Sequence, residues 1–469
     1  MTLDSVPQPN SPEARDIAYQ MHPMVDQRRY EKTGGLVIER GEGVYVFDSS
    51  GKRYIEGLAG LWSVALGFGE KRLADVAYEQ MQKLPYYHTF AYRTHGPAID
   101  LAEKLVQISP EHLTRAHFTS SGSEANDLVV KMIWYRSNAL GKPEKKKIIG
   151  RIKGYHGVTI AAGSVTGLPN NHRSFDLPLD RMIHTLTPDY WREAQEGESE
   201  LDFSKRMAAA LEEMILAEGP DTIAAMFGEP VMGAGGVIVP PEGYFEKIQA
   251  VLQKYDVWMI ADEVITGFMR TGNMWGSQTF GIRPNTLSCA KQLSSAYLPI
   301  AAVMVDDPIY QAIADESKAI GAFGHGYTYS GHPVSAAVAL RTLQLYEERN
   351  TLAHVQAIYP AFQKRLKALA EHPLVGEARG VGLVGAVELV ADKPSKREFD
   401  AKAGVAAQCV EFAQAHGVIL RAIGAGAVTI CPPLMIEEGQ IHEIFDALEK
   451  ALDDTEGWVN KQGLRQVAA

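Results

Sequence analysis

The chain of 469 residues has few cysteines and no long apolar run, and each shortage excludes a class of protein. Its three cysteines, Cys289, Cys409 and Cys431, are far apart in the sequence, so they form neither a disulfide framework nor a metal cluster. No stretch approaches the roughly 18 consecutive apolar residues that a membrane-spanning helix needs. The first ten residues lack the basic and then apolar segments of a signal peptide. We therefore expect a cytoplasmic protein without a metal site and without membrane contact.

An excess of positive charge is also absent. The chain carries 46 Lys and Arg residues against 57 Asp and Glu residues, which gives a formal net charge of −11. This balance argues against a surface that binds nucleic acid or an anionic membrane. Apolar residues make up 46% and charged residues 22%, as in ordinary globular proteins, and a chain of this length can form more than one structural unit. We expect small molecules as its partners.

The most informative segment is the apolar run 257–261, which ends in Asp262 and Glu263. Such a run predicts a buried strand of a parallel sheet, and open α/β sheets bind ligands at the carboxyl ends of their strands. Lys291 follows a second short apolar stretch and could enter the same cleft from a neighbouring strand. An ionised Asp beside a reactive Lys suits pyridoxal phosphate, because the lysine forms a Schiff base and the carboxylate keeps the pyridine nitrogen protonated.

The same strand pattern is also typical of P-loop NTPases. That class requires a Walker A motif, which neither Gly51-Lys52-Arg53 nor Gly141-Lys142-Pro143 supplies. A lone lysine in a loop is more often a solvated charge than a reactive group. The pair of Asp262 and Lys291 therefore needs a third element to support it.

The third element is a strand followed by a serine- and glycine-rich helix start. Residues 116–120 read as a short strand, and Ser121, Gly122 and Ser123 open a helix whose apolar residues recur at helical spacing. A helix N-terminus with free N–H groups, hydroxyl donors and little side-chain bulk is an anion site. Ordinary helix capping would explain the serines alone, but the strand-end Asp and the downstream Lys favour a phosphate cradle.

With these residues in place, the chain resembles the class III pyridoxal-phosphate aminotransferases of the ω-amino acid or amine:pyruvate kind. The resemblance runs from about Tyr30 to Leu434. Seven motifs in the family's order carry it: 120–127 (SSGSEAND), 154–157 (GYHG), 228–231 (GEPV), 261–264 (ADEV), 290–291 (AK), 324–333 (GHGYTYSGHP) and 432–434 (PPL). The resemblance implies an enzyme that moves an amino group from a terminal amine or ω-amino acid to pyruvate. Pyridoxamine phosphate would be the form of the cofactor between the two half-reactions.

The resemblance also implies which residues bind the cofactor. Lys291 would hold it and move the proton, Asp262 would face the pyridine nitrogen, and Tyr155 and Val264 would cover the two faces of the ring. The other implied cofactor-binding residues are Ser121, Gly122, Ser123, His156, Glu229 and Thr328. Thr328 resembles the family threonine that reaches the phosphate of the neighbouring subunit. This implies a homodimer with shared active sites, which could in turn form a tetramer.

A further set of residues is implied for the substrate. It comprises Trp62, Phe90, Ala91, Tyr155, Ala234 and Arg421. The planar fork of Arg421 matches a carboxylate and can swing aside for an uncharged amine. Met232 and Ala234 stand where ornithine-type relatives carry polar residues, which favours pyruvate over 2-oxoglutarate. The loop 424–426 lacks the usual Gly-Asp and is one residue longer, so the position of Arg421 stays open.

The order of predicted elements indicates an α/β protein of the family's fold type I. From residue 73 to residue 330, helical patterns alternate with short apolar strands at 116–119, 147–150, 224–227, 258–261, 286–288 and 300–305, which predicts a large domain with a mostly parallel sheet covered by helices. We read residues 192–217 as one charged, solvent-facing helix. Residues 1–72, an N-terminal arm and a hairpin, and residues 331–469 would together form a smaller α+β domain.

Two kinds of alternative remain. The same cofactor chemistry could serve an aminomutase, an α-decarboxylating transaminase or an aminotransferase that uses 2-oxoglutarate. From a different class, the chain could be a non-catalytic protein that kept the fold, but Lys291, Asp262 and the phosphate loop together argue against that. The sequence does not identify the amine donor.

Overall fold

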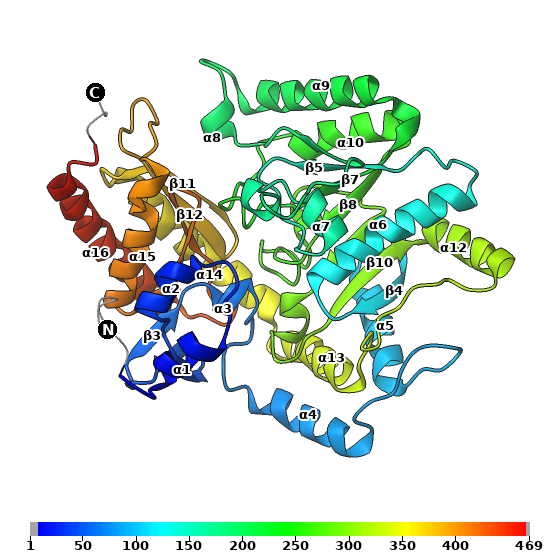
Figure 1. The fold of residues 1–469 in the computed structure, drawn as a ribbon, viewed down its shortest axis with the longest axis horizontal. Coiled ribbons are helices and arrows are strands. Elements are labelled where there is room, and N and C mark those ends of the chain that lie inside the picture. The colour runs from blue at the N-terminus through cyan, green and yellow to red at the C-terminus, as the bar shows by residue number, and fades with distance from the viewer. Residues whose placement is uncertain (1–7, 466–469) are drawn as a thin grey trace.

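The computed structural model describes residues 8–465 and has a seven-stranded sheet at its centre (Figure 1). β10 is antiparallel to both of its neighbours, and the other pairs are parallel. Every residue of β7, β8, β9 and β10 is buried, as expected of strands covered on both faces. The strand order is β4 (Leu113–Thr119), β10 (Ala301–Asp306), β9 (Thr286–Cys289), β8 (Trp258–Asp262), β7 (Ile223–Gly228), β5 (Lys147–Arg151) and β6 (Met182–Thr185).

Helices cover both faces of this sheet because successive strand residues point to opposite sides. On one face, Phe227 and Ile260 pack in a core with α6 (Gly122–Ala139), α7 (Ile160–Val165) and α12 (Asp307–Ile320). On the other face, Met226 and Met259 pack with α9 (Glu200–Glu218) and α10 (Tyr244–Lys254). The central strands are thereby fixed from both sides, and their carboxyl ends are held as a rigid edge.

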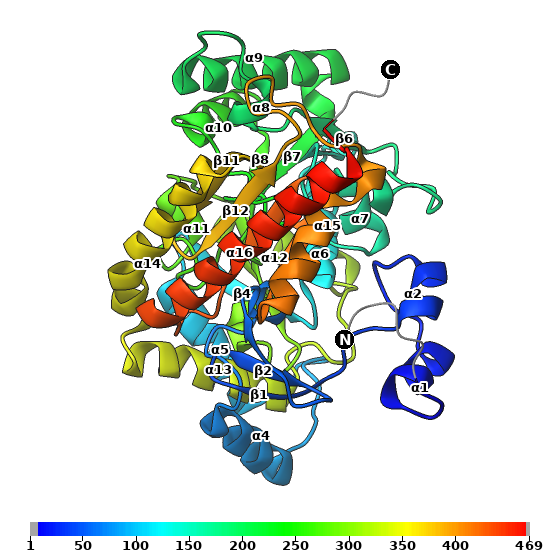
Figure 2. The same ribbon diagram turned by 90° about the vertical axis from the view of Figure 1, so that its left-hand side faces the viewer.

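Two four-stranded sheets stand beside the central sheet. The first joins β1 (Ile38–Glu42), β2 (Tyr45–Asp48) and β3 (Arg53–Glu56) to β13 (Val418–Ile419), so it combines segments from both ends of the chain. The second has the order β11 (Val375–Val381), β12 (Val384–Leu389), β15 (Ala427–Ile430) and β14 (Arg421–Ile423). Figure 2 shows α14 (Thr351–Ala368), α15 (Val405–Ala415) and α16 (Glu438–Gln462) in front of this second sheet.

The remaining helices are short or connect these units. α13 packs against α4 and α5, which links the start of the C-terminal third to the segment before the large sheet. The bounds of all these remaining helices are α1 (Pro12–Tyr19), α2 (Gln27–Thr33), α3 (Ala59–Trp62), α4 (Lys71–Lys83), α5 (Gly96–Ile108), α8 (Tyr190–Glu193), α11 (Gly276–Thr279) and α13 (Pro333–Glu348). No helix within residues 8–465 is long and apolar enough to cross a membrane.

The expected α/β architecture with a mostly parallel sheet is confirmed, and all six strands expected between residues 73 and 330 are present. The reading of residues 192–217 as one solvent-facing helix is wrong. α8 ends at Glu193, and α9 starts at Glu200 after its N-cap Ser199. α9 also buries an apolar face that includes Phe203 and Leu211, because it covers the sheet.

Two expectations stay open. The division of the chain at residues 72 and 330 stays a prediction. The first seven residues of the expected N-terminal arm lie outside the described residues.

Candidate active site

The carboxylate of Asp262 lies at the carboxyl end of β8 and is only 5% exposed. Its Oδ2 accepts hydrogen bonds from Asn126 Nδ2 at 2.7 Å and from His156 Nδ1 at 2.9 Å. Its Oδ1 accepts a bond from the backbone N–H of Val264 at 3.1 Å. An ionised carboxylate has only acceptors, so it matches these three donors. The donors come from α6, from the segment after β5 and from the turn after β8, which ties these three segments together.

Asn126 is a candidate site residue that the sequence analysis did not identify. It is 1% exposed, and its Nδ2 also donates to the carbonyl of His156 at 2.7 Å. Its Oδ1 accepts a bond from Ser288 Oγ at 2.7 Å, and Ser288 is the register partner of Asp262 on β9. The motif at 120–127 contains Asn126, but only the fold reveals that its amide faces the strand-end carboxylate. Asn126 thus connects Asp262 to the strand that leads to Lys291.

Lys291 follows β9 and has a left-handed backbone with φ of 49°. A lysine at positive φ is uncommon and costs backbone energy, which is typical of functional sites. The side chain is half-buried, and desolvation lowers the pKa of its amine to about 8, although Asp262 acts in the opposite direction. A substantial fraction of the amine is therefore neutral near pH 8, as a nucleophile or base must be.

The loop Ser121–Ser123 forms the N-terminus of α6. Ser121 Oγ accepts a bond from the N–H of Glu124 at 3.2 Å, so this serine caps the helix. A Cβ at Gly122 would lie 3.1 Å from Val264 Cγ2, so a larger residue at 122 would crowd the turn after β8. Ser123 Oγ accepts a bond from the N–H of Val158 at 3.2 Å. The helix start, the turn with Val264 and the segment 155–158 therefore meet at one point.

A hydrogen bond, and not a strand, sets the position of Val264. β8 ends at Asp262, so Val264 lies in a turn, and strand alternation does not determine which way it points. The bond from its N–H to Asp262 Oδ1 holds it there instead. Val264 lies against Gly122 at the start of α6.

Glu229 links Tyr155 to the loop that contains Ala234. Its Oε1 accepts a bond from the N–H of Tyr155 at 3.0 Å, and its Oε2 accepts one from the N–H of Gly233 at 3.1 Å. Burial raises the pKa of this carboxyl group, and the nearby charge of His156 opposes the shift. Glu229 thus holds the backbone on either side of the site, and Ala234 is half-exposed directly after Gly233.

Arg421 begins β14 and lies close to Tyr155. Burial lowers the pKa of its guanidinium, and the nearby Tyr155 opposes this. Burial likewise raises the pKa of Tyr155. The charge of Asp262 raises it further, and the charge of Arg421 lowers it. Lys291 experiences the charge of Arg421 as well. The chain turns at Gly424, where φ is 59°, between β14 and β15, and the placement of Arg421 relative to the family's arginine stays a prediction.

Trp62 is 2% exposed and packs in an apolar cluster with Val231, Val237, Ile265 and Cys431. Cys431 is close enough to Lys291 for each to shift the pKa of the other. Trp62 therefore borders the same site from the side of the small sheets.

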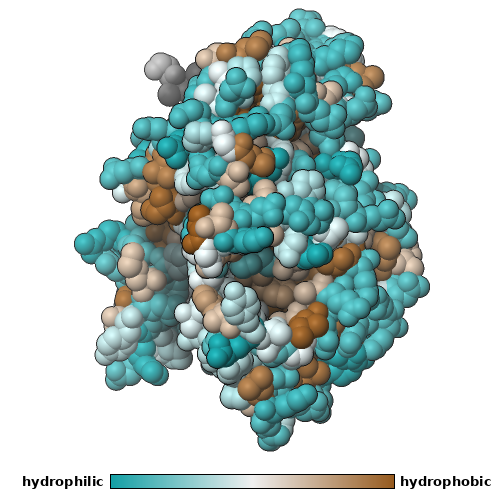
Figure 3. Space-filling model, turned by 90° about the vertical axis from the view of Figure 1, so that its right-hand side faces the viewer, coloured by the Kyte–Doolittle hydropathy of each residue, from teal (hydrophilic) through white to brown (hydrophobic). Residues whose placement is uncertain are grey.

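Phe90, Ala91 and Thr328 lie together in a second group. The carbonyl of Thr328 accepts a bond from Tyr86 OH at 2.7 Å, and a Cβ at Gly326 would lie 2.7 Å from Phe90 Cζ. Phe90 and Ala91 line a cavity of about 1320 Å³ with residues 321–327 and part of α12. Figure 3 views the molecule from the α12 side and shows apolar residues around a hollow in a mostly hydrophilic surface. Phe90 and Thr328 thus belong to two loops that contact each other, and Asp127 and Lys131 of α6 also line the cavity.

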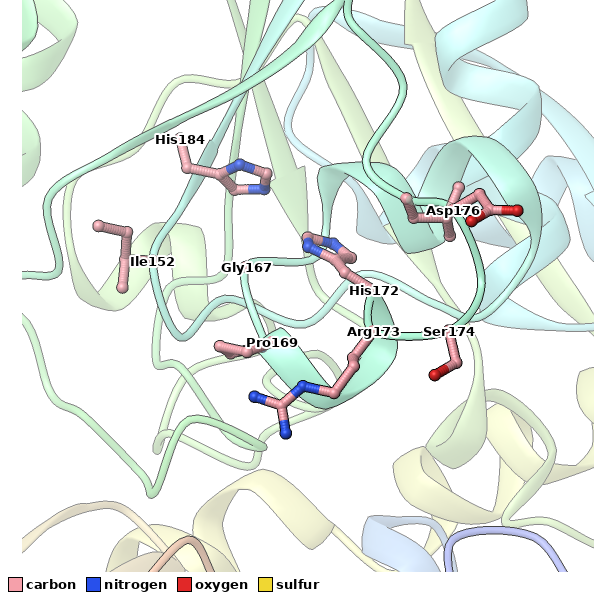
Figure 4. Close-up of a pocket in the computed structure, with 9 residues that line it drawn as sticks. Ile152, Gly167, Pro169, His172, Arg173, Ser174, Asp176 and His184 are labelled. Carbon is pink, nitrogen blue, oxygen red and sulfur yellow. The ribbon is translucent and has the colours of Figure 1, made fainter.

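A separate open cavity of about 550 Å³ lies beside β6 (Figure 4). None of the candidate site residues lines it. Two histidines face it, and both have structural partners: His172 Nε2 bonds to the carbonyl of Gly163, and His184 Nε2 bonds to those of Val165 and Thr166. These bonds hold the loop 163–172 against the sheet, and we assign no chemistry to the cavity.

Comparison with known proteins agrees with this site. The model of the family "Aminotransferase class-III" matches residues 26–452, so the chain belongs to the class III aminotransferases. Gamma-aminobutyrate transaminase 1, mitochondrial, of Oryza sativa subsp. indica is 48% identical over 459 residues, which cover 97% of this chain and 89% of that protein.

Solved structures give the same result. The omega transaminase from Pseudomonas jessenii in complex with PMP has a TM-score of 0.94 and 53% identity, covering 96% of this chain and 99% of that one. A thermostable omega transaminase variant engineered for asymmetric synthesis of enantiopure bulky amines has a TM-score of 0.94 and 52% identity, covering 96% of this chain and 100% of that one. The protein is a pyridoxal-phosphate-dependent aminotransferase of fold type I.

The residues present fit this cofactor. β8, β9 and α6 bring three features together. These are the carboxylate of Asp262 with its three donors, the amine of Lys291 with its lowered pKa, and the start of α6, where an added Cβ at Gly122 would be in tight contact with Val264. Those three features are what a pyridine nitrogen, an aldehyde carbon and a phosphate require.

The role of Asn126 is testable by removing its amide. Asn126→Ala removes one charge-assisted donor from Asp262, and such bonds are worth about 1.5–3 kcal/mol. We expect the half-reaction with an amine, followed as loss of the visible absorption of the holoenzyme, to slow by roughly ten- to a hundredfold. Asn138→Ala, at the exposed end of the same helix, is the control. An Asn126→Ala enzyme as fast as this control would contradict the role.

The lowered pKa of Lys291 predicts the pH dependence of cofactor loading. Only the neutral amine of Lys291 attacks the aldehyde of the cofactor, and the pKa of this amine is about 8. When pyridoxal phosphate is added to cofactor-free enzyme, the rate at which the visible absorption band appears should therefore rise towards pH 8 and then level off. Nα-acetyl-lysine, with an ordinary pKa near 10.4, should continue to gain rate beyond pH 9 under the same conditions. An enzyme profile that follows this reference compound would show that the site does not lower the pKa.

Proposed function

We propose that the enzyme transfers the amino group of a terminal amine or an ω-amino acid to pyruvate, forming alanine and an aldehyde, a ketone or a semialdehyde. The observation that carries this proposal is the guanidinium of Arg421 beside Tyr155 and Lys291. Within residues 8–465 no carboxylate forms an ion pair with it, and Glu229 bonds to two backbone N–H groups. A half-buried arginine without a partner suits a substrate carboxylate, and it can turn away for an uncharged amine.

The loop 231–237 supports pyruvate as the acceptor. Met232 is fully buried, and Ala234, which is half-exposed, offers only a methyl group. Lys153, which approaches this loop at Gly235, is paired with Asp189 at 3.0 Å. Because Lys153 is paired, Arg421 offers a place for one carboxylate, so a monocarboxylic keto acid such as pyruvate suits this site better than a dicarboxylic one.

The names of the relatives support the donor side. Gamma-aminobutyrate, named for the rice transaminases, carries its amine at the end opposite its carboxylate. The engineered omega transaminase variant has substitutions of a tryptophan, a phenylalanine and an arginine, and these have the same spacing along its chain as Trp62, Phe90 and Arg421 have here. We therefore assign these three residues to the substrate pocket.

The chain's own residues divide the work of the reaction. The cofactor supplies an electron sink for charge that develops on the substrate carbon. Asp262 would hold the pyridine nitrogen, and residues 121–123 would hold the phosphate. The neutral amine of Lys291 would accept the proton from the carbon that bears the amino group. Tyr155 would cover one face of the ring.

We also propose that two chains share each active site. Thr328 is exposed, and Phe90 lies with it rather than with Trp62, although both Phe90 and Trp62 are assigned to one pocket. A second copy that presents its Phe90, Ala91 and Thr328 to the first copy's site would resolve this separation. The exposed aromatic rings of Tyr92 and Tyr329 in the same loops favour such an interface.

The function is tested with Arg421→Ala in separate half-reactions. Loss of a charge-assisted pair worth about 1.5–3 kcal/mol should raise the Michaelis constant for pyruvate by about ten- to a hundredfold. The half-reaction with an amine that lacks a carboxylate should change little. Arg283→Ala, an exposed arginine before β9, is the control. Equal weakening of both half-reactions would make Arg421 structural.

The products separate the proposed function from its alternatives. A transaminase that uses pyruvate forms alanine in a one-to-one ratio with the aldehyde or ketone. Formation of glutamate from 2-oxoglutarate without alanine from pyruvate would overturn the assignment of the acceptor, and amino-group migration within one molecule would indicate an aminomutase.

The shared site predicts that activity depends on assembly. Sedimentation at assay concentration should give a dimer or a tetramer, and Thr328→Ala should lose pyridoxal phosphate more readily than the unchanged enzyme because a phosphate contact from the second chain is missing. A monomer with full activity would contradict the proposal.

A further inference from the structure

The segment that carries Trp62 has a strained backbone. It follows β3 and includes Ala59 with φ of 49°, Gly60 with φ of 67° and Trp62 with φ of 63°. A positive φ is uncommon for a non-glycine residue, and such residues cost roughly 1–3 kcal/mol each unless their surroundings enforce the conformation. Something outside this short segment must therefore hold it.

Glu56, the last residue of β3, supplies that hold. Its Oε1 accepts a bond from the N–H of Leu58 at 2.9 Å, and its carboxyl group also accepts one from the backbone of Gly60. The side chain is 6% exposed, and within residues 8–465 no Lys, Arg or His forms an ion pair with it. Burial raises the pKa of Glu56 to about 7. Burying an acid without a partner cation costs free energy. The role that the structure indicates for Glu56 is therefore to hold the backbone through these two hydrogen bonds.

The held segment leads directly to the active site. The backbone N–H of Trp62 donates to the carbonyl of Leu58, whose own N–H donates to Glu56. The Trp62 ring packs beside Val231, Ile265 and Cys431, and Cys431 also bonds through its N–H to the carbonyl of Gly57 at 2.7 Å. A shift of residues 57–60 therefore moves the ring that borders the loop 231–237.

We propose that Glu56 is a positioning residue that fixes Trp62 and so sets which amines the pocket admits by size. The inference rests on the proposed function, because it takes Trp62 as a wall of the amine pocket. Glu56 itself does not touch the substrate. Without the two bonds, the backbone of residues 58–62 relaxes from its left-handed conformations, and the tryptophan no longer limits the pocket.

Asp48 provides a matched control on the neighbouring strand. It is 7% exposed, and its Oδ1 accepts bonds from the N–H groups of Ser50 and Lys52, while its Oδ2 accepts one from Tyr54 OH. Like Glu56, it is a buried acid that holds a backbone turn. Its turn precedes β3, at the opposite end of that strand from residues 57–62, so Asp48→Asn should affect stability without changing amine selectivity.

The experiment measures the half-reaction of the holoenzyme with a bulky aryl amine and a small alkyl amine, without a keto acid. Glu56→Ala should shift the ratio of the two rate constants towards the bulky amine by at least about fivefold, and Trp62→Ala should shift it in the same direction. The double variant should shift it no further than Trp62→Ala alone, because both changes act through one ring. Asp48→Asn should leave the ratio unchanged.

Each other outcome overturns the inference. An unchanged ratio in folded Glu56→Ala, or additive shifts in the double variant, would mean that Glu56 does not act through Trp62. If Glu56→Ala fails to fold, Glu56→Gln, which keeps one acceptor oxygen, should show a smaller shift in the same direction. If neither variant folds while Asp48→Asn does, Glu56 serves stability alone. An unchanged enzyme that reacts with neither amine would contradict the proposed function itself, and the inference with it.

Discussion

The structure of the active site depends on one buried carboxylate and its three donors. Asp262 draws Asn126 from α6, His156 from the segment after β5 and the N–H of Val264 from the turn after β8. Hydrogen bonds to a charged group in a buried site are among the stronger polar contacts in a protein. They set the helix start at residues 121–123, the segment 155–158 and the carboxylate of Asp262 in one frame, and Ser288 extends this frame to the strand that precedes Lys291.

Other buried acids of the site hold backbone rather than cations. Glu56 holds residues 58–60, Glu229 holds Tyr155 and Gly233, and Glu263 accepts bonds from the N–H groups of Gly276 and Ser277. Burial raises the pKa of each of these three groups. The loops next to these three acids are thereby held without ion pairs, and within residues 8–465 no carboxylate pairs with the guanidinium of Arg421.

Much of this arrangement followed from the sequence because it is local. The apolar run before Asp262, the short stretch before Lys291 and the Ser-Gly-Ser helix start each have a pattern that specifies an element and its end. The contacts of Asn126 with Asp262 and Ser288 join segments far apart in the chain, so only the pairing of β8 with β9 and the packing of α6 bring them together. The loop of Trp62 and its tether Glu56 escaped notice because positive φ at Ala59 and Trp62 contradicts local preference. The buried face of α9 was missed although apolar residues at helical spacing, such as Phe203, Met207, Leu211 and Ile215, form it.

The most direct test of this account is the rate constant of the amine half-reaction in Asp262→Asn. The substitution keeps the size of the side chain and removes the charge. The account predicts a folded enzyme that still binds pyridoxal phosphate but reacts at least about a hundredfold more slowly, in line with the removal of one electrostatic contact in other enzymes. Asp306→Asn, at the end of β10, where a buried carboxylate accepts bonds from Asn285 and Ile309, is the matched control and should react at the normal rate. An Asp262→Asn enzyme that reacts within about threefold of this control would show that the site does not depend on the charge at the end of β8.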